Sequence, residues 1–287
     1  MLDKELSVAM DLARTAGALI LDYYTNGFEA EEKIGLDEFV EPVTIADKMA
    51  SRLIVDGLSA TFPNDGILSE EEPDSEHRLG CKRVWMIDPL DGTAGFIKRD
   101  GDFAVQIGLV ESGKPILGVV YLPIGSTMFH ATVNGGAFAG SGDFAARRLE
   151  VSAVTEMGLI RMAASRNHYS PKMKRVVDEF GIQSEVRRGS VGLKVGLIAE
   201  STADLYLHLS PHTKQWDTCA PQVILEEAGG RLTDMFGSAI EYNTPDIRNH
   251  NGILASNGVI HEASVSRLRL LLNEFGRRPH RLTNPVR

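Results

Sequence analysis

The stretch that decides the fold is "MIDPLDGT", residues 86–93. The apolar run at residues 84–87 leads straight into it and predicts a short buried strand. Two aspartates, a proline and a glycine then follow within residues 88–92. Because proline lacks the backbone N–H that a sheet ladder needs, Pro89 is expected to stop the pairing.

The donor atoms of this turn suit a metal ion and a phosphate. With the ladder ended, Asp88, the carbonyl of Leu90 and Asp91 can all turn toward one ion. Gly92 lets the backbone approach a ligand closely, and the amides of Gly92 and Thr93 can hold a phosphate oxygen. A lone Asp-Gly pair is an ordinary turn signal. We interpret the stretch as an ion-and-phosphate corner at a strand end, with a simple polar turn as the alternative.

Further acids stand at other predicted element ends. Glu70, Glu71 and Glu72 follow a short apolar run in "ILSEEEP", and Asp217 in "QWDTC" begins a later helix. Like charges brought together are costly unless a cation joins them. Because the set offers oxygen donors without histidine or thiolate, it points to Mg²⁺.

Composition narrows the class of protein. The chain has 287 residues, 43% of them hydrophobic, which suits one large domain or two packed subdomains. A net charge of -9 argues against nucleic-acid polymers and membranes as partners, although bound cations would still allow a small anionic substrate. Two cysteines give no disulfide framework, and no apolar run suits a bilayer span or a signal peptide. We therefore expect a cytoplasmic protein without an integral membrane segment.

Periodicity predicts two helices and then an antiparallel meander in the first half of the chain. Apolar residues at i, i+3, i+4 spacing predict helices over residues 9–23 and 46–61, the second ended by Pro63. The period then changes to two, as in strands. Strands are expected at residues 103–109, 115–122, 127–133 and 137–139, with a hairpin turn at "NGG".

Strands and helices alternate in the second half. Strands are expected at residues 160–165, 184–188, 203–209, 231–234 and 252–256. Helices are expected from Ser170 and Pro171 to Gly181, and at residues 191–200, 219–230 and 264–275. Such alternation places helices on both faces of a sheet. The fold class predicted is mixed α/β, a layered α-β-α-β-α sandwich with subdomains at residues 1–150 and 151–287.

Three segments together resemble the signature segments of the inositol monophosphatase superfamily. They are "DPLDGT" followed by Phe96, the upstream "SEEE" and the downstream "WDTCAPQVILEEAGG". The resemblance covers nearly the whole chain, in order. It implies a Mg²⁺-dependent, typically lithium-sensitive phosphomonoesterase that binds two Mg²⁺ ions, with a third near Glu70 in some members. It also implies in-line attack by an activated water on a small phosphorylated metabolite, without a phosphorylated intermediate.

Other segments are similar to the 3′(2′),5′-bisphosphate nucleotidase branch. These are "SPHTKQWDTCAP", "SRNH" at residues 165–168 and "GLK" at residues 192–194. They imply hydrolysis of 3′-phosphoadenosine 5′-phosphate to AMP and phosphate. Against this, Ala94 and Gly95 stand where that branch usually has Lys-Glu, and "SVG" at residues 190–192 is closer to the inositol-phosphate branch.

Two alternative functions therefore stay open. An inositol monophosphatase or related sugar phosphatase is one, although no acid stands near His208 to take inositol hydroxyls. A non-catalytic phosphate sensor on the same fold is the other. The resemblance leaves open whether the chain is a monomer or a homodimer.

The resemblance assigns three kinds of role. The metal ligands that it implies are Glu70, Asp88, Asp91, Asp217 and the carbonyl of Leu90. The catalytic residues are Glu70, Thr93, which helps to activate water, and Asp47, which holds the threonine hydroxyl. The substrate contacts are Gly92, Thr93, His168, Lys194 and Asp217.

Each role has a simpler structural alternative. Thr44 and Asp47 also match a capping box for the second helix, and Asp217 suits an N-cap. His168 by itself is typical of a surface loop, and Lys194 of a solvated helix face.

Some neighbouring residues are left with structural interpretations. Whether Glu71 also binds metal is open, because it adjoins Glu70 directly. Asp100 and Asp102, on either side of a glycine, predict only a turn. Trp216 is expected to pack rather than to contact substrate.

Overall fold

A computed structural model of the chain describes residues 2–34, 40–142, 145–166 and 170–280. The strand that carries the quoted stretch, β4 (Arg83–Asp91), lies in a seven-stranded sheet with the order β3-β4-β5-β6-β7-β8-β9. Its other members are β3 (Gly66–Ser69), β5 (Ala104–Glu111), β6 (Lys114–Leu122), β7 (Thr127–Thr132), β8 (Gly136–Ser141) and β9 (Arg147–Arg148). Pairing from β4 to β9 is antiparallel, which confirms the predicted meander, whereas β3 runs parallel to β4.

The pairing of β4 does not stop at Pro89, so that part of the prediction was wrong. Asp88 pairs with Gln106 and Asp91 pairs with Ala104, so β4 advances one residue more than β5 between these pairs. Pro89 lies inside this bulge, where its missing N–H removes no regular ladder bond. A bulge bends the strand and changes the direction of its side chains. The strand therefore carries both carboxylates itself.

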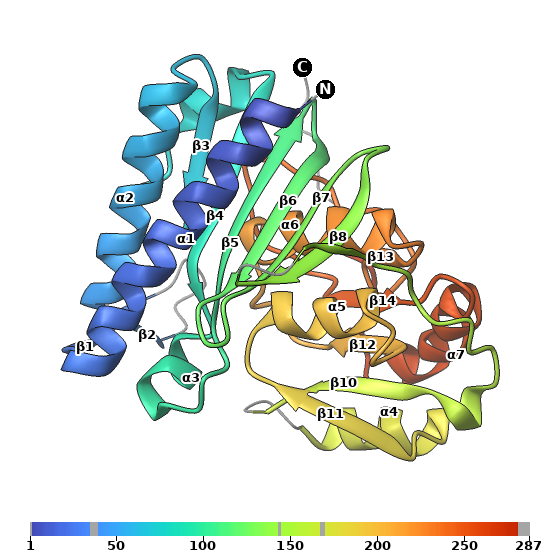
Figure 1. Cartoon of the computed structure of the whole chain (residues 1–287). Coiled ribbons are helices and arrows are strands. Elements are labelled where there is room, and N and C mark those ends of the chain that lie inside the picture. Colours follow the sequence, from blue (N-terminus) through green and yellow to red (C-terminus); the bar gives the residue numbers. More distant parts are fainter. Residues whose placement is uncertain (1, 35–39, 143–144, 167–169, 281–287) are drawn as a thin grey trace.

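Two long helices cover the outer face of this sheet. Helices α1 (Asp3–Asn26) and α2 (Ile45–Thr61) lie side by side there (Figure 1), as predicted. Helix α2 ends two residues before Pro63, as expected from the steric limit on residues before proline. The face of α1 that packs inward is small, which lets the helix approach closely, and consists of Ala9, Ala13, Ala16, Gly17 and Ile20.

A second sheet completes the layered architecture. Helices α5 (Val191–Ala199) and α6 (Gln215–Glu227) lie between the two sheets, and α4 (Pro171–Phe180) and α7 (His261–Glu274) cover the far side (Figure 1). The sheet has the order β11-β10-β12-β14-β13. Its strands are β10 (Arg161–Ser165), β11 (Ser184–Arg188), β12 (Leu205–His208), β13 (Arg231–Thr233) and β14 (Ile253–Ser256). The predicted α-β-α-β-α layering is confirmed.

Local capping explains why several boundaries were predictable. The hydroxyl of Ser170 accepts a hydrogen bond from the amide of Met173, Pro171 is the first residue of α4, and Gly181 ends the helix in the left-handed region. Helix α6 begins at Gln215, four residues before the predicted range 219–230 and two residues before Asp217, where the sequence suggested that the helix begins.

The two-stranded hairpin near the N-terminus was not predicted. Strands β1 (Ala30–Ile34) and β2 (Val40–Thr44) pair antiparallel. Their sequences, AEEKI and VEPVT, are too polar to show a buried alternation. Short elements complete the chain and were also not predicted: α3 (Thr93–Lys98) and the 3₁₀ helices at Glu76–Gly80 and Met157–Leu159.

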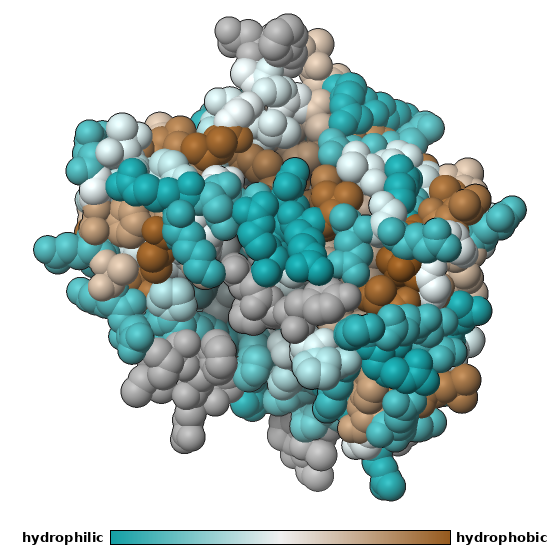
Figure 2. Space-filling view, turned by 90° about the horizontal axis from the view of Figure 1, so that it is seen from below, coloured by the Kyte–Doolittle hydropathy of each residue, from teal (hydrophilic) through white to brown (hydrophobic). Residues whose placement is uncertain are grey.

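The apolar side chains lie mainly between the layers. One cluster fills the space between α1, α2 and the large sheet, a second lies between the sheets around α5 and α6, and a third lies beneath α4 and α7. The face seen in Figure 2 is largely hydrophilic, and its apolar patches are separate. Among the described helices, none combines the length and the apolar character that crossing a bilayer requires.

Helix α6 rests directly on glycines of the large sheet. A Cβ on Gly118 would lie 2.2 Å from the carbonyl oxygen of Ala220, and one on Gly108 would lie 2.5 Å from Sγ of Cys219. At Gly118 the clash is with helix backbone, which no side-chain rotation relieves. These glycines therefore fix how closely α6, and with it Asp217, approaches β5 and β6.

We expect Gly118→Ala to lower the free energy of unfolding by about 1–3 kcal/mol, because the added methyl must push α6 away from the sheet. Urea unfolding of the variant and the wild type measures this. Gly80→Ala is the matched control, since a Cβ there meets nothing within 4 Å, and it should stay within about 0.5 kcal/mol of the wild type. Equal stability of the two variants would contradict the close contact inferred between α6 and Gly118.

Candidate active site

Three of the predicted metal ligands lie together. One carboxylate oxygen from each of Asp88, Asp91 and Asp217 lies within 4.8 Å of the other two. Asp88 and Asp91 come from the bulged end of β4, and Asp217 comes from the first turn of α6. Residues far apart in the sequence thus meet where the large sheet and the central helix layer join.

The electrostatics of this cluster fit a bound cation. Burial raises the pKa of Asp88 well above its ordinary value, and repulsion from Glu70, Asp91 and Asp217 adds to the effect. Burial likewise raises the pKa of Asp217, reinforced by Asp91 and Glu70. Buried like charges of this kind are stable as carboxylates only with a positive partner. The oxygen-only donor set suits Mg²⁺, which the residues present are able to hold.

Asp91 is oriented by donors on α5 and β5. Its Oδ2 accepts hydrogen bonds from the hydroxyl of Ser190, from the amide of Gly192 (2.9 Å) and from Nε2 of Gln106 (2.5 Å). Burial raises the pKa of Asp91, while the Ser190 hydroxyl opposes the shift. Since all three donors bind Oδ2, Oδ1 is the atom left to face a cation.

Neither Ser190 nor Gln106 was predicted from the sequence to be a site residue. Ser190 is the N-cap of α5, where its hydroxyl also accepts from the amide of Leu193 at 3.1 Å. A serine before an apolar helical run signals a cap. No local signal shows that the same hydroxyl contacts Asp91.

Asp217 has a capping role besides its place in the cluster. It is not the N-cap, as the simpler alternative supposed, but the third residue of α6, and its Oδ2 accepts the backbone amide of Lys214 at 2.6 Å. This bond fixes the carboxylate at the start of the helix. A capping function and a ligand function are therefore compatible, because a carboxylate has two oxygens and several acceptor positions.

Glu70 and Glu71 share a lysine that the sequence did not single out. Nζ of Lys33, on β1, lies 2.8 Å from Oε1 of Glu70 and also contacts Glu71. Burial alone would lower the pKa of Lys33, but these two carboxylates hold it above its ordinary value. Burial and repulsion from Glu70 raise the pKa of Glu71 to about 7. Lys33 lies in the hairpin that was not predicted, so no motif pointed to it.

Asp47 combines both functions considered for it. Its Oδ2 accepts the amide of Thr44 at 2.8 Å and the Thr44 hydroxyl at 2.5 Å, which completes the capping box of α2. Its Oδ1 accepts the hydroxyl of Thr93 at 3.0 Å. Burial raises the pKa of Asp47, although the bonds from Thr44 oppose the shift.

Gly92 occupies a position that requires glycine. Its φ is 105°, in the left-handed region, and a Cβ there would lie 2.5 Å from the carbonyl oxygen of Asp102. It is the N-cap residue of α3, which begins at Thr93. The first amides of a helix have no intrahelical acceptor, so those of Gly92 and Thr93 lie where a ligand oxygen can bind them.

Lys194 is buried in α5 and is not on a solvated helix face. Its exposed fraction is 2%, and Nζ donates to the carbonyl of Gly189 at 2.9 Å and lies 5.1 Å from the ring centre of Tyr206. Burial lowers its pKa to about 8, opposed by Asp91, Asp217 and Asp102. The ammonium group therefore interacts electrostatically with the carboxylates of the acidic cluster. His168 lies outside the described residues.

The turn at residues 100–102 has a longer-range function than expected. Oδ2 of Asp102 accepts the amide of Gly189 at 3.1 Å, next to the start of α5. Arg166 pairs with Asp100 at 3.1 Å and with Asp102 at 2.8 Å. The turn thus ties the end of α3 to the second sheet, and nothing local in "RDGD" indicated this.

A cavity of about 590 Å³ opens beside the acidic cluster. Its polar wall includes Glu70, Asp91, Thr93, Lys194 and Asp217, so these five predicted site residues lie around one space. Met173, Val191, Leu207 and Leu209 form an apolar part of its lining. Trp216 is buried as expected and also lines this space. A ligand with a charged end and a flat apolar part would match both walls.

Comparisons with known proteins point to the family that the sequence segments resemble. The model of the inositol monophosphatase family matches residues 1–271. A protein of Salmonella typhimurium named 3′(2′),5′-bisphosphate nucleotidase CysQ is 36% identical, over 83% of this chain and 93% of its own length. The protein of the same name from Haemophilus influenzae is 34% identical, over 75% and 80%.

Solved structures of similar fold include both kinds of relative. The IMPase of Thermotoga maritima superposes with a TM-score of 0.79 at 25% identity, covering 95% of this chain and all of its own. CysQ from Bacteroides thetaiotaomicron, described as a bacterial member of the inositol monophosphatase family, gives 0.71 at 28% identity, covering 88% and 97%.

The acidic cluster predicts a metal-dependent stability that Asp88→Asn should abolish. In EDTA the variant should melt at or above the wild-type temperature, because one buried like charge is removed while the side chain keeps its size. Added Mg²⁺ should then raise the melting temperature of the wild type much more than that of the variant.

Asp11→Asn is the control for this test, because Asp11 is an exposed helix residue outside the cluster. It makes the same charge change and should keep the full response to Mg²⁺. If Mg²⁺ raised the melting temperature of Asp88→Asn as much as that of the wild type, Asp88 would not be a metal ligand.

Proposed function

The chain belongs to the inositol monophosphatase family, and we propose that it is a Mg²⁺-dependent 3′(2′),5′-bisphosphate nucleotidase. Its reaction would convert 3′-phosphoadenosine 5′-phosphate and water to AMP and phosphate. The observation that carries the proposal is the approach of Asp88, Asp91 and Asp217 to within 4.8 Å beside the cavity. Relatives named bisphosphate nucleotidases at 34% to 37% identity support this substrate.

The proposed metal ligands divide into two sets. Glu70, Asp88 and the carbonyl of Leu90 would hold one ion, and Asp88, Asp91 and Asp217 would hold a second, while a third ion near Glu70 is a further expectation. When bound, Mg²⁺ supplies positive charge that neutralises the phosphate and activates water. The chain's own task is then to position the substrate and to accept a proton.

Thr93 and Asp47 would form the path for that proton. Because the Thr93 hydroxyl donates to Oδ1 of Asp47, its oxygen lone pairs are free to accept a proton from the attacking water. As that proton arrives, the hydroxyl proton passes to Asp47. Burial favours this transfer, since it raises the pKa of Asp47. The capping box holds Asp47 in place from its other oxygen.

The cavity supports a nucleotide in preference to a small polyol. The amides of Gly92 and Thr93 would hold the phosphate that is hydrolysed, and the ammonium of Lys194 would hold the second phosphate of the nucleotide. The apolar side chains of Met173 and Leu207 line the same cavity and suit a flat base, whereas inositol carries hydroxyls on every ring carbon. His168 remains a proposed contact on the resemblance alone.

The departures at Gly95 and at residues 190–192 have structural explanations, whereas nothing in the structure explains Ala94. A Cβ on Gly95 would lie 2.8 Å from the carbonyl oxygen of Asp102 and 2.7 Å from Oδ1 of Asp100, so the tight turn after α3 leaves no room for a side chain. Ser190 and Gly192 hold Asp91, which is a task independent of the substrate. Neither departure therefore favours inositol phosphate, which stays the second candidate because solved relatives include IMPases.

Other expectations remain proposals of the same kind. Cys81 and Cys219 are free thiols, which is compatible with the cytoplasmic location expected from the sequence. The division into subdomains at residues 1–150 and 151–287 also stays a prediction. The same holds for the assembly, which we expect to be a monomer or a homodimer.

Thr93→Ala and Asp47→Asn should each slow turnover by about 10²–10⁴-fold, the usual contribution of a positioned acid or base. If the two residues act as one proton path, the double variant should be little slower than either single variant. Asp47→Asn would also weaken a helix cap, at a cost of about 1 kcal/mol. Measuring kcat together with the melting temperature separates the roles, since a change confined to stability would leave only the cap.

A phosphate-release panel tests the substrate directly. We expect 3′-phosphoadenosine 5′-phosphate to have a higher kcat/KM than inositol 1-phosphate or fructose 1,6-bisphosphate, and EDTA to stop release from all three. Lys194→Met, which keeps the buried stem, should raise KM for the nucleotide more than for inositol 1-phosphate. A preference of the wild type for inositol 1-phosphate would make the inositol candidate correct. Absence of release from every substrate would favour the phosphate sensor.

A further inference from the structure

A second cavity, of about 650 Å³, lies apart from the acidic cluster. It is lined by the segment that follows β13, by residues of α7 and by the residues just beyond that helix. Gln215 lines this cavity, whereas Trp216 and Asp217 line the other. The start of α6 therefore separates the two spaces.

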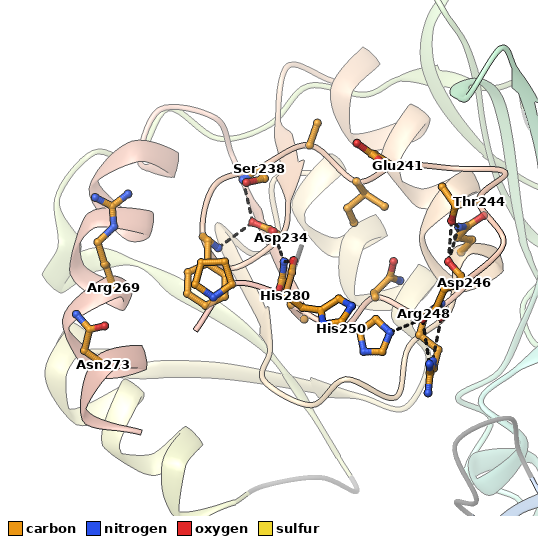
Figure 3. Close-up of a pocket in the computed structure, with 18 residues that line it drawn as sticks. Asp234, Ser238, Glu241, Thr244, Asp246, Arg248, His250, Arg269, Asn273 and His280 are labelled. Atoms are coloured by element: carbon orange, nitrogen blue, oxygen red, sulfur yellow. Dashed lines mark hydrogen bonds and ion pairs between the residues drawn. The ribbon is translucent and has the colours of Figure 1, made fainter. Parts of the chain in front are cut away.

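Two histidines and an aspartate meet in this second cavity. One ligand atom from each of Asp246, His250 and His280 lies within 4.8 Å of the other two. The imidazole rings of His250 and His280 have their centres 4.2 Å apart, and Nε2 of His250 lies 2.7 Å from Oδ2 of Asp246. Figure 3 shows the three side chains together, with Arg269 and Asn273 of α7 across the cavity.

Hydrogen bonds between side chains and the backbone hold the segments that carry the cluster, although His280 is exposed. The amide of His280 donates to Oδ1 of Asn251 at 2.7 Å, and Nδ2 of Asn251 donates to the carbonyl of His280 at 3.0 Å. Arg277 donates to the carbonyl of His250 at 2.9 Å and also binds the carbonyl of Leu209. The chain beyond α7 is thus fastened to the loop that carries His250.

The loop itself is attached to the segment that begins α6. The amide of Gln215 donates to the carbonyl of Ile247 at 2.9 Å, and the amide of Asn249 donates to the carbonyl of Thr213 at 2.8 Å. The backbone of this loop is therefore held both by the chain beyond α7 and by the segment that begins α6. Such fixed placement lowers the free-energy cost of arranging ligands around an ion.

From this geometry we infer that Asp246, His250 and His280 form a binding site for a first-row transition-metal ion of the Zn²⁺ or Co²⁺ type, separate from the Mg²⁺ ligands. Imidazole nitrogens favour such ions over Mg²⁺, which prefers oxygen alone. Three protein ligands, two histidines and a carboxylate, are a common zinc set that leaves a fourth position open. The cavity beside them provides space for water or a small ligand there.

Arg248 also binds the carboxylate of Asp246, but it leaves an acceptor position for a metal ion. Its guanidinium donates to Oδ1 through Nε and to Oδ2 through the terminal nitrogen, both at 2.9 Å. An ionised carboxylate has about four acceptor positions, so an ion can bind where His250 now donates. The histidine then carries its proton on the other ring nitrogen. Arg248 would orient the carboxylate, as partners of metal ligands commonly do.

The test uses the full chain and Co²⁺ as a visible probe, in excess Mg²⁺ so that the oxygen-only cluster is saturated. Four-coordinate Co²⁺ absorbs visible light much more strongly than six-coordinate Co²⁺, so the spectrum reports which kind of site is filled. We expect one equivalent to bind with the strong spectrum. His280→Ala and His250→Ala should each weaken this binding by at least about tenfold. Zn²⁺ should compete for the site and raise the melting temperature of the wild type but not that of these two variants.

His77→Ala is the matched control, because His77 lies outside the cavity, next to a thiol at 3.7 Å. It should keep the Co²⁺ spectrum and affinity of the wild type. His280 lies outside every helix and strand, so His280→Ala should remain folded, which its circular dichroism verifies. The inference fails if His280→Ala and His250→Ala titrate like the wild type, if only the weak spectrum forms, or if His77→Ala removes the strong one.

Discussion

Repulsion among Asp88, Asp91 and Asp217 is the constraint on which the rest of the structure depends. The three carboxylates converge to within 4.8 Å at a place where burial already raises the pKa of each. Left to themselves they would separate or take up protons. The fold keeps them together because β4 carries Asp88 and Asp91, α6 carries Asp217, and donors such as Ser190 hold Asp91 in place.

The central helix layer makes that convergence possible. Helix α6 brings Asp217 to β4 because the sheet beneath it presents Gly108 and Gly118, which allow backbone contact. Helix α5 brings Ser190 and Lys194 to the same place from the other half of the chain. Neither half of the chain contains the whole site. The packing between the two sheets therefore assembles the site and also stabilises the fold.

Positive charge is distributed to match the acids in a chain whose net charge is -9. Lys33 faces Glu70, Lys194 lies near Asp91, and Arg166 neutralises the turn at Asp100 and Asp102. The two ligand clusters then differ in donor type, since Asp88, Asp91 and Asp217 offer only oxygen and the second cluster adds imidazole. This difference would favour Mg²⁺ at the first cluster and a transition metal at the second.

The sequence alone determined features that depend on neighbouring residues. Helical periodicity, the cap at Ser170 and the acids of "MIDPLDGT" predicted the layers and the kind of chemistry, because spacing and short-range hydrogen bonds express them. Only the tertiary structure decided that β4 continues through Pro89, that Lys194 is buried and that Lys33 reaches Glu70. Those outcomes depend on packing between segments distant in the sequence, which no local pattern records.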